Sequence, residues 1–390
     1  MRRPVVSMTL GVLLRLGLAA PQLTMRTGGF SADTFPTTYM SKRGLDMLKR
    51  DFAAGMSEPT LVVVDGDVAD AGVRRALEGF VDRLEDDGRF TVTGLSMDAD
   101  GSLAVLQMVL DTDAQSEEAR AAIRDLRETL VPASFDGTGA AVYVGGDTAA
   151  QMDSTDMTDG YMPIVIGVVL SLSFVLLLLA FRSLLVAVTA IVMNLLSVGA
   201  AYGALTLVFQ HGWGDVIPGL ITVESIESWV PLLMFCVLFG LSMDYQVFLL
   251  SRIRERWYET GESMESVVFG VQSTAGIITG AALIMIAVFI GMGSGQMVVL
   301  QELGFGLAIA VLLDAFVVRV VVAPAMIALI GDRYWWLPRR LEWLPRIEIE
   351  GKAPAAVTPA GAGPSRALRI GDGARRSPDA SYRPLKTAAP

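Results

Sequence analysis

WVPLLMFCVLFGLSMDYQVFLLSR, residues Trp229–Arg252, is the stretch that decides the fold. Between Trp229 and Leu250, Asp244 is the one charged side chain, and nearly every other residue is apolar. About 20 predominantly apolar residues are enough for a helix to cross a hydrocarbon core about 30 Å thick. This stretch therefore predicts a membrane-spanning helix that carries a single acid below the middle of the bilayer.

Four further apolar runs of this length occupy the second half of the chain. A large soluble protein can bury an apolar helix, but five such runs in so short a region would leave no surface for water. The sequence therefore predicts a polytopic membrane protein. The four further runs are Met162–Phe181, Ser183–Phe209, Val267–Met292 and Leu303–Ile330.

The composition excludes several classes of protein. The chain of 390 residues is 52% hydrophobic and 18% charged, with a formal net charge of −10. Acidic residues outnumber basic ones by 41 to 31, which argues against nucleic-acid binding. One cysteine excludes an internal disulfide, and one histidine leaves little for a histidine-based metal site. We find no nucleophile motif, metal set or cofactor loop, so we predict a protein that is not an enzyme and binds no cofactor.

A weaker apolar run, Val5–Ala20, follows Arg2 and Arg3 and is interrupted by Arg15. An arginine at the centre of a span costs about 2.5–3.5 kcal/mol on an insertion scale. The run has the features of a signal peptide, but Pro21 directly after it argues against cleavage. We favour an uncleaved, short first helix, and either alternative carries the following region across the membrane.

The distribution of Lys and Arg predicts the orientation. Arg182 follows the first long run, Arg252, Arg254 and Arg256 follow the third, and eleven basic residues follow Ile330. The alternate loops, 210–228 and 293–296, contain no basic residue. Both termini are therefore predicted to be cytoplasmic, in a multi-pass protein of the cell membrane.

Residues 25–160 carry a different pattern, with short alternating runs between helical stretches. They contain 12 basic and 25 acidic residues, a net charge of −13. The predicted order is strand, helix, strand, strand, helix, strand, which is the split-βαβ or ferredoxin-like arrangement. The clustered acids Asp98, Asp100, Asp111 and Asp113 are interpreted as turn residues in preference to a calcium site. The predicted segments are 59–65, 70–85, 90–97, 102–111, 117–130 and 140–145.

Ionisable residues inside the membrane are candidates for function by default. Counting from Trp229 at 1.5 Å per residue places Asp244 about 22 Å along its helix. A carboxylate at that depth must be paired, hydrated or protonated, and the adjacent Tyr245 offers a hydroxyl to a proton relay. Asp314 lies at a similar depth in the last span, with Arg319 about one turn further, as a secondary ionisable pair or a structural one.

Other polar or small residues in the spans are interpreted as structural. Asn194, Ser242 and Ser251 are predicted to hold helices together, and Glu302 is interpreted as hydrated near an interface. Two Gly-x-x-x-Gly pairs, at 199 and 203 and at 276 and 280, are predicted to let helices approach closely.

The motif Gly240–Ile253, GLSMDYQVFLLSRI, resembles the MmpL family of RND-type exporters, in its actinobacterial form. The likeness extends over nearly the whole chain to about Leu344. Further matching stretches are IESWVP at 226–231, NLLSVGAAYG at 194–203, GAALIM at 280–285, VLLDA at 311–315 and GDRYWWLP at 331–338.

The resemblance implies proton-driven export of lipids or other hydrophobic molecules. In the family, the Asp-Tyr pair at the positions of Asp244 and Tyr245 is the proton-relay element. One departure is Gln246, where family members usually have Glu, which places any second-acid role there in doubt.

The larger departure is length, because this chain is similar to the C-terminal half of a full family member. A full member has two Asp-Tyr helices, so Asp244 has no counterpart here. Three explanations stay open: a homodimer, a separate N-terminal-half partner, or a fragment of a broken gene. Rival functions are a non-pumping membrane interaction subunit and a protein-translocation motor subunit of the SecD/SecF kind.

The predicted protein is thus an α-helical polytopic membrane protein of about six helices, with an α+β ferredoxin-like extracytoplasmic domain. Its cargo is a lipid or hydrophobic small molecule, and membrane lipids surround it. The predicted divisions are a short first helix at 1–24, the extracytoplasmic porter-like domain at 25–160, a five-helix membrane region at 161–335, and a basic, disordered cytoplasmic tail at 336–390.

Overall fold

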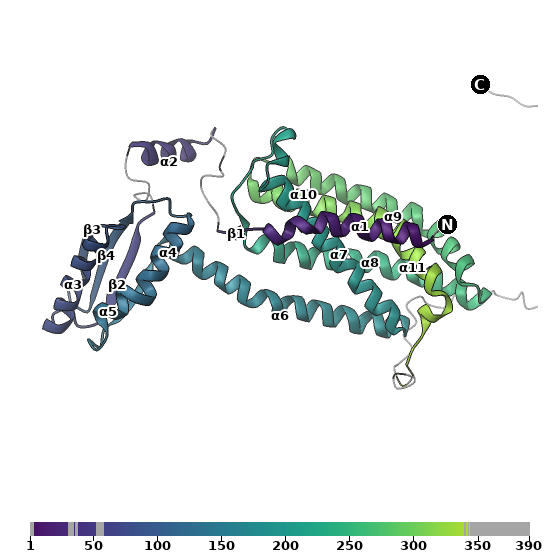
Figure 1. Cartoon of the computed structure of the whole chain (residues 1–390), viewed down its shortest axis with the longest axis horizontal. Coiled ribbons are helices and arrows are strands. Elements are labelled where there is room, and N and C mark those ends of the chain that lie inside the picture. The colour runs from purple at the N-terminus through teal and green to yellow at the C-terminus, as the bar shows by residue number, and fades with distance from the viewer. Residues whose placement is uncertain are drawn as a thin grey trace, which may run out of the picture. The chain divides into compact units, whose positions relative to one another are not determined.

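The computed structural model describes residues 4–29, 35, 38–51, 58–338, 341 and 343. The chain is mostly helical, and within these residues six helical segments are long and apolar enough to cross a membrane (Figure 1). The predicted number of spans is therefore confirmed. Nearly all of the predicted disordered tail lies outside the described residues. The six segments are Pro4–Thr24, Asp147–Phe181, Leu184–Phe209, Trp229–Thr260, Ser263–Gly293 and Val298–Trp335.

The first and last spans are each built from more than one helical element. The first is α1 followed by the 3-10 turn η1, and the last contains a π-helical stretch, η6, between two α-helices. The four spans between them are single α-helices. The bounds are α1 (Pro4–Ala19), η1 (Ala20–Thr24), α6 (Asp147–Phe181), α7 (Leu184–Phe209), α8 (Trp229–Thr260), α9 (Ser263–Gly293), α10 (Val298–Leu312), η6 (Leu313–Val322), α11 (Ala323–Ile330) and η7 (Gly331–Trp335).

Two helices extend well beyond the apolar runs that predicted them. Helix α6 begins at Asp147, well before the apolar run. Its first turns are polar, and they continue into the apolar part as one helix. α8 continues to Thr260, so the loop predicted around Arg252 is wrong. Ion pairs at i,i+3 spacing, Arg252–Glu255 at 2.8 Å and Arg256–Glu259 at 3.0 Å, line this polar end of the helix.

Between the first two spans lies a four-stranded antiparallel sheet in the order β3-β4-β2-β5. The chain order is strand, helix, strand, strand, helix, strand, and each predicted segment is present within one or two residues, except that the second helix runs on to Phe135. The elements are β2 (Thr60–Asp65), α3 (Ala71–Asp87), β3 (Phe90–Met97), β4 (Leu103–Leu110), α4 (Glu117–Asp125), η4 (Leu126–Leu130), α5 (Val131–Phe135) and β5 (Ala141–Gly145).

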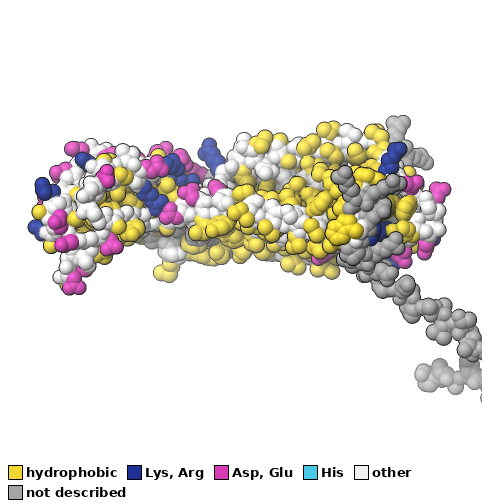
Figure 2. All heavy atoms as spheres, turned by 90° about the horizontal axis from the view of Figure 1, so that it is seen from below, with side chains coloured by type: hydrophobic (Ala, Val, Ile, Leu, Met, Phe, Trp, Pro, Cys, Tyr) yellow, Lys and Arg dark blue, Asp and Glu magenta, His cyan; other side chains and the backbone are white. Residues whose placement is uncertain are grey.

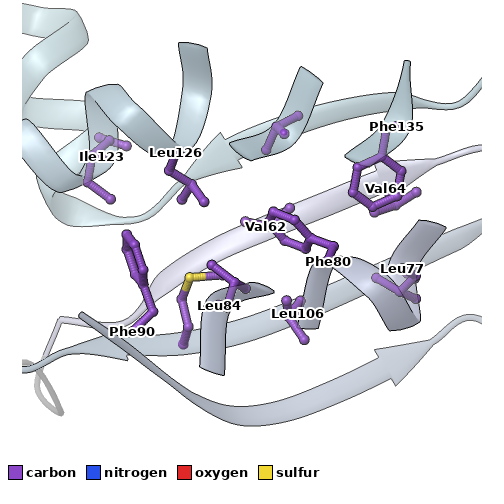
Figure 3. Close-up of a cluster of buried hydrophobic side chains, with 14 of the residues drawn as sticks. Val62, Val64, Leu77, Phe80, Leu84, Phe90, Leu106, Ile123, Leu126 and Phe135 are labelled. Carbon is purple, nitrogen blue, oxygen red and sulfur yellow. The ribbon is translucent and has the colours of Figure 1, made fainter. Parts of the chain in front are cut away.

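The helices cover one face of this sheet and bury a single apolar core (Figure 3). Phe80 of α3 contacts Phe135 of α5 edge to face, with ring centroids 5.4 Å apart. Asp98 closes the β3–β4 turn by accepting hydrogen bonds from the Ser102 hydroxyl and the Leu103 amide. Ala149, in the first turn of α6, is part of the same core and ties that long helix to the sheet.

Several short elements of the described structure have no counterpart in the sequence-based prediction, among them the 3-10 turn η5 (Trp213–Val216). Helix α2 (Met40–Asp51) precedes the sheet. Strands β1 (Thr27–Gly28) and β6 (Ile226–Glu227) form a parallel pair that joins the end of the first span to the segment before α8. The Ser228 hydroxyl donates to the Gly28 carbonyl oxygen at 2.8 Å and reinforces this junction.

Helix α1 packs closely against neighbouring membrane helices, because glycines at the contacts lack the Cβ atoms that would prevent the approach. A Cβ added at Gly203 of α7 would overlap the carbonyl oxygen of Leu18, and one added at Gly11 would lie 2.5 Å from Val322 of η6. Gly199 and Gly203 thus act as predicted. Gly276 and Gly280 have no atom within 4 Å of an added Cβ in the described structure, so the predicted close approach there is wrong.

The outer surface of the helices is apolar, as Figure 2 shows. On α6, Ile164, Val168 and Leu172 are spaced four residues apart and are each about 60% exposed. Residues at this spacing share one face of a helix, so α6 presents a continuous apolar stripe. Such a surface is suited to lipid and unsuited to water.

Candidate functional site

The most polar point inside the membrane helices is an ion pair between Asp314 and Arg319, both on η6. The Arg319 guanidinium contacts the Asp314 Oδ2 atom at 2.7 Å through Nη2 and 3.2 Å through Nε. The Arg319 side chain is 4% exposed and the Asp314 side chain 11%. Residues five apart do not share a face of an α-helix, but the i→i+5 hydrogen bonding of a π-helix brings them together. The π-helical stretch is therefore what makes this pair.

Two polar residues from neighbouring helices complete the cluster. The Ser242 hydroxyl of α8 lies 2.9 Å from Asp314 Oδ2 and also contacts the side-chain amide of Asn194 on α7. A hydroxyl has one proton to donate, and Asn194 Nδ2 otherwise has no partner. Ser242 Oγ therefore donates either to Asn194 Oδ1 or to Asp314 Oδ2. Asn194 and Ser242 link α7, α8 and η6, as predicted for polar residues that hold helices together.

Tyr245 faces this cluster, whereas Asp244 does not. The Arg319 guanidinium lies 4.7 Å from the centre of the Tyr245 ring, and the Tyr245 hydroxyl contacts Met285 Sδ at 3.4 Å. Asp244 is exposed on the outside of the helices, and no hydrogen bond or ion pair joins it to the described residues. Consecutive residues of an α-helix point about 100° apart. The structure therefore unites Tyr245, Asp314 and Arg319 and separates Asp244 from them.

A small cavity of about 20 Å³, with room for about one water molecule, adjoins the cluster. Asp314, Ser242, Asn194 and Tyr245 supply its polar wall, and apolar side chains such as Val311 supply the rest. Asp314 Oδ1 has no hydrogen-bond partner in the described structure. One carboxylate oxygen is therefore held by Arg319 and Ser242 while the other is left free beside the cavity, an arrangement that can accept a proton.

Arg15 is a member of this region that sequence analysis missed. Its side chain is fully buried, Nη1 lies 3.9 Å from Met193 Sδ on α7, and Nε and Nη2 have no partner among the described residues. The guanidinium is close enough to Asp314 for electrostatic attraction. Arg15 thus lies between helices instead of in lipid. The one sequence signal for Arg15 was the free-energy cost of a charge inside the membrane. The direction of its side chain could not be predicted, because that direction depends on how α1 packs.

The structure also corrects the sequence-based interpretation of Glu302. Its side chain is only 1% exposed, so the interpretation as a hydrated interfacial residue is wrong. It lies in the first turn or two of α10, close to the parallel strand pair β1–β6. Within the described residues, no group of three or more His, Cys, Asp or Glu side chains is arranged to hold a metal ion.

A family model and several curated relatives all point to the same family. The model of the MMPL family matches residues 33–351. The chain is 36% identical to the mycolic acid-containing lipids exporter MmpL11 of Mycolicibacterium smegmatis over 91% of its length, and equally similar to the heme uptake protein MmpL11 of Mycobacterium tuberculosis. It is 30% identical to the trehalose monomycolate exporter MmpL3 of M. tuberculosis. These alignments cover 37% to 39% of the relatives, so the chain spans well under half their length.

Proposed function

This chain belongs to the MMPL family, and from that premise we propose that it is a half-size, proton-driven exporter of lipids or other hydrophobic molecules in the cell membrane. The observation that carries the proposal is the buried cluster of Asp314, Arg319, Ser242 and Tyr245 within the membrane helices. Buried ion pairs are poor devices for stability but good candidates for a charge-controlled switch.

The proton relay in this proposal begins at Asp244 and Tyr245. Asp244 lies on the outer face of α8, and Tyr245 reaches Arg319 on the inner face. When the proton reaches Asp314, this carboxylate loses its negative charge and its ion pair with Arg319 weakens. The weaker pair lets α8 and η6 shift relative to each other. A proton that moves down the membrane potential supplies about 2.3 kcal/mol per 100 mV.

The exposed position of Asp244 also supports the proposal that a partner protein binds this face of α8. A charged side chain that faces lipid without a counterpart is costly, and burial against a second polar surface removes that cost. We propose that this face of α8 is covered by a second copy of the chain or by a separate N-terminal-half partner. Either would place a second set of polar groups opposite Asp244.

The orientation and domain assignment belong to the same proposal. The sheet order β3-β4-β2-β5 and the strand–helix sequence support a split-βαβ, ferredoxin-like domain. We assign this domain to the extracytoplasmic side and both termini to the cytoplasm, because basic residues flank the opposite ends of the spans. The cargo would bind between this domain and the outer leaflet.

The decisive experiment uses the assembly purified from its native membrane and reconstituted into vesicles. Asp244→Asn and Asp314→Asn should each abolish pH-driven proton flux and cargo export, because neither amide can take up and release a proton. Glu259→Gln, an exposed acid at the polar end of α8, should leave both unchanged. Full export with Asp244→Asn would refute the relay.

A second candidate is a non-pumping membrane interaction subunit, which the unpartnered Asp244 face also favours. It predicts that Asp244→Asn leaves export unchanged while a bulky substitution on this face, such as Gly240→Trp, prevents recovery of the partner. Because both candidates place a partner on this face, export by Asp244→Asn is the result that separates them.

A further inference from the structure

A cavity with an acidic lining lies where the β1–β6 strand pair meets the first turns of α10. Its volume is about 550 Å³, and the residues that line it in the described structure include no Lys or Arg. We call it the acidic cavity. Its five acids are Asp113, Glu118, Glu224, Glu227 and Glu302.

Two of these acids are buried and three are solvent-accessible. Glu302 is 1% exposed and Glu227 is 9% exposed, whereas Glu118 and Glu224 are exposed and Asp113 is partly so. Neither carboxylate oxygen of Glu302 has a hydrogen-bond partner among the described residues. The main-chain amide of Glu227 faces it, but the geometry falls short of a hydrogen bond.

The backbone around Glu302 is held against a neighbouring helix. Two residues further along α10, a Cβ added at Gly304 would overlap the backbone nitrogen of Gly293 on α9 and lie 2.5 Å from the Phe289 oxygen. α10 is therefore in backbone contact with α9, and its first turns are fixed.

Among the described residues that line the cavity, none carries a positive charge to compensate this carboxylate. Arg120 of α4 lies beside the backbone of Gly28 and 3.8 Å from Glu117. The facing ends of α7, α8 and α9 contribute no Lys or Arg, and their nearest titratable groups are His211, Tyr202 and Cys236, of which His211 contacts Thr24 and Tyr202 donates to the Pro231 oxygen. Asp215 in the same loop accepts from Thr222.

A buried carboxylate without a partner is most stable when it binds a proton, because the charged form costs several kcal/mol to desolvate. The neighbouring acids add repulsion that also favours proton uptake. Burial raises the pKa of Glu227 to about 7, so this carboxyl takes up and releases protons near neutral pH.

From this geometry we propose that Glu302 and Glu227 form a proton-loading site that collects protons from the acidic cavity and supplies them to the Asp314 cluster. The inference rests on the proposed proton-driven export. Glu302 and Asp314 lie twelve residues apart on the continuous helix α10–η6, about 18 Å along its axis. The three accessible acids concentrate protons at the mouth, since a cleft of one sign focuses the field.

The first experiment detects the bound proton and does not depend on transport. Infrared difference spectra of the purified protein between pH 5 and pH 9 should contain a protonated-carboxyl band that Glu302→Gln removes. Glu224→Gln, an exposed acid of the same cavity, should leave that band intact. Because Glu227 contributes its own component, the proposal would be overturned by a difference spectrum that Glu302→Gln leaves unchanged. Glu302→Asp keeps a carboxyl and should restore a shifted band if Glu302→Gln does not fold.

The second experiment measures proton-driven flux against the pH on the side of the acidic cavity. Loss of the loading site should lower the flux in Glu302→Gln and Glu227→Gln about tenfold near neutral pH, with partial recovery in acid, because focusing raises encounter rates by at least that factor. Glu78→Gln, which changes an exposed acid of α3 outside the cavity, should leave the flux unchanged.

The two proposals fail in different ways. If Asp244→Asn and Asp314→Asn abolish flux while Glu302→Gln keeps the normal pH profile, the loading site is wrong and the exporter stands. If Asp244→Asn and Asp314→Asn leave flux intact, the relay is wrong, and the infrared band alone decides whether Glu302 holds a proton.

Discussion

At the scale of single residues, Arg15, Asp314 and Asp244 each carry an intramembrane charge in a different setting. Asp314 is paired with Arg319 at 2.7 Å, Arg15 is buried with two unpaired nitrogen atoms, and Asp244 is exposed on the outside of α8. Sequence analysis identified Asp314, Arg319 and Asp244 as ionisable groups within spans. It did not distinguish their settings, because hydropathy reports depth in the membrane and not the direction of a side chain.

Arg15→Met should raise the stability of the protein and lower its proton-driven flux. Methionine has a similar length and no charge, and replacing a buried ionic group by an apolar one stabilises proteins by up to about 1–4 kcal/mol. The same change removes the positive charge that attracts Asp314. Thermal unfolding in lipid nanodiscs and flux in vesicles measure the two effects.

The control is Arg252→Met, which removes a charge that pairs with Glu255 at the polar end of α8. It should change the unfolding temperature little, because solvated ion pairs contribute about 0–1 kcal/mol. A fall in stability for Arg15→Met would mean that Arg15 has a partner that stabilises the helices, and would contradict the expectation.

At the scale of elements, strand and helix positions followed closely from periodicity. β3 was predicted with its observed bounds, and the N-terminus of α3 follows from Asp70, whose side chain accepts from the Gly72 and Val73 amides. The errors fell where a helix changes from apolar to polar, at the start of α6 and the end of α8. Neither change of composition interrupts helical hydrogen bonding, so it marks a change of solvent and not an end of the element.

Gly304→Val should disrupt the contact between α9 and α10. The added side chain would meet the Gly293 backbone and the Phe289 oxygen, and overpacking of this kind costs about 1–3 kcal/mol. We expect a lower unfolding temperature in detergent and a weaker infrared signal from Glu302.

Gly280→Val on α9 is the matched control, since no atom lies within 4 Å of an added Cβ in the described structure. It should leave the unfolding temperature unchanged. Equal destabilisation by both substitutions would show that helix propensity, and not the α9–α10 contact, is responsible.

At the scale of the whole molecule, the acidic net charge resolves into regions. Residues 25–160 have a net charge of −13, with 12 basic and 25 acidic residues, while residues 331–390 have 11 basic and 6 acidic residues, a net charge of +5. This asymmetry predicts that the sheet domain and the polar end of α8 lie on opposite sides of the membrane.

Cysteine labelling tests that topology directly, because Cys236 is the single native cysteine. In a Cys236→Ala background, Asp100→Cys in the β3–β4 turn should react with a membrane-impermeant maleimide on intact cells. Glu259→Cys near the end of α8 should react only after lysis. The reverse pattern would overturn the orientation and place the acidic cavity on the cytoplasmic side.

The sequence by itself determined the membrane class, the six spans and the strand order of the intervening domain, because hydrophobic length and periodicity are local properties of the chain. Only the tertiary structure decided that Arg15 is inside the helices, that Glu302 is buried beside Glu227, and that Asp244 faces outward while Tyr245 contacts Arg319. Those facts depend on the rotation of each helix about its axis and on contacts between residues far apart in the chain. Packing against distant helices sets that rotation, and no short window of sequence contains it.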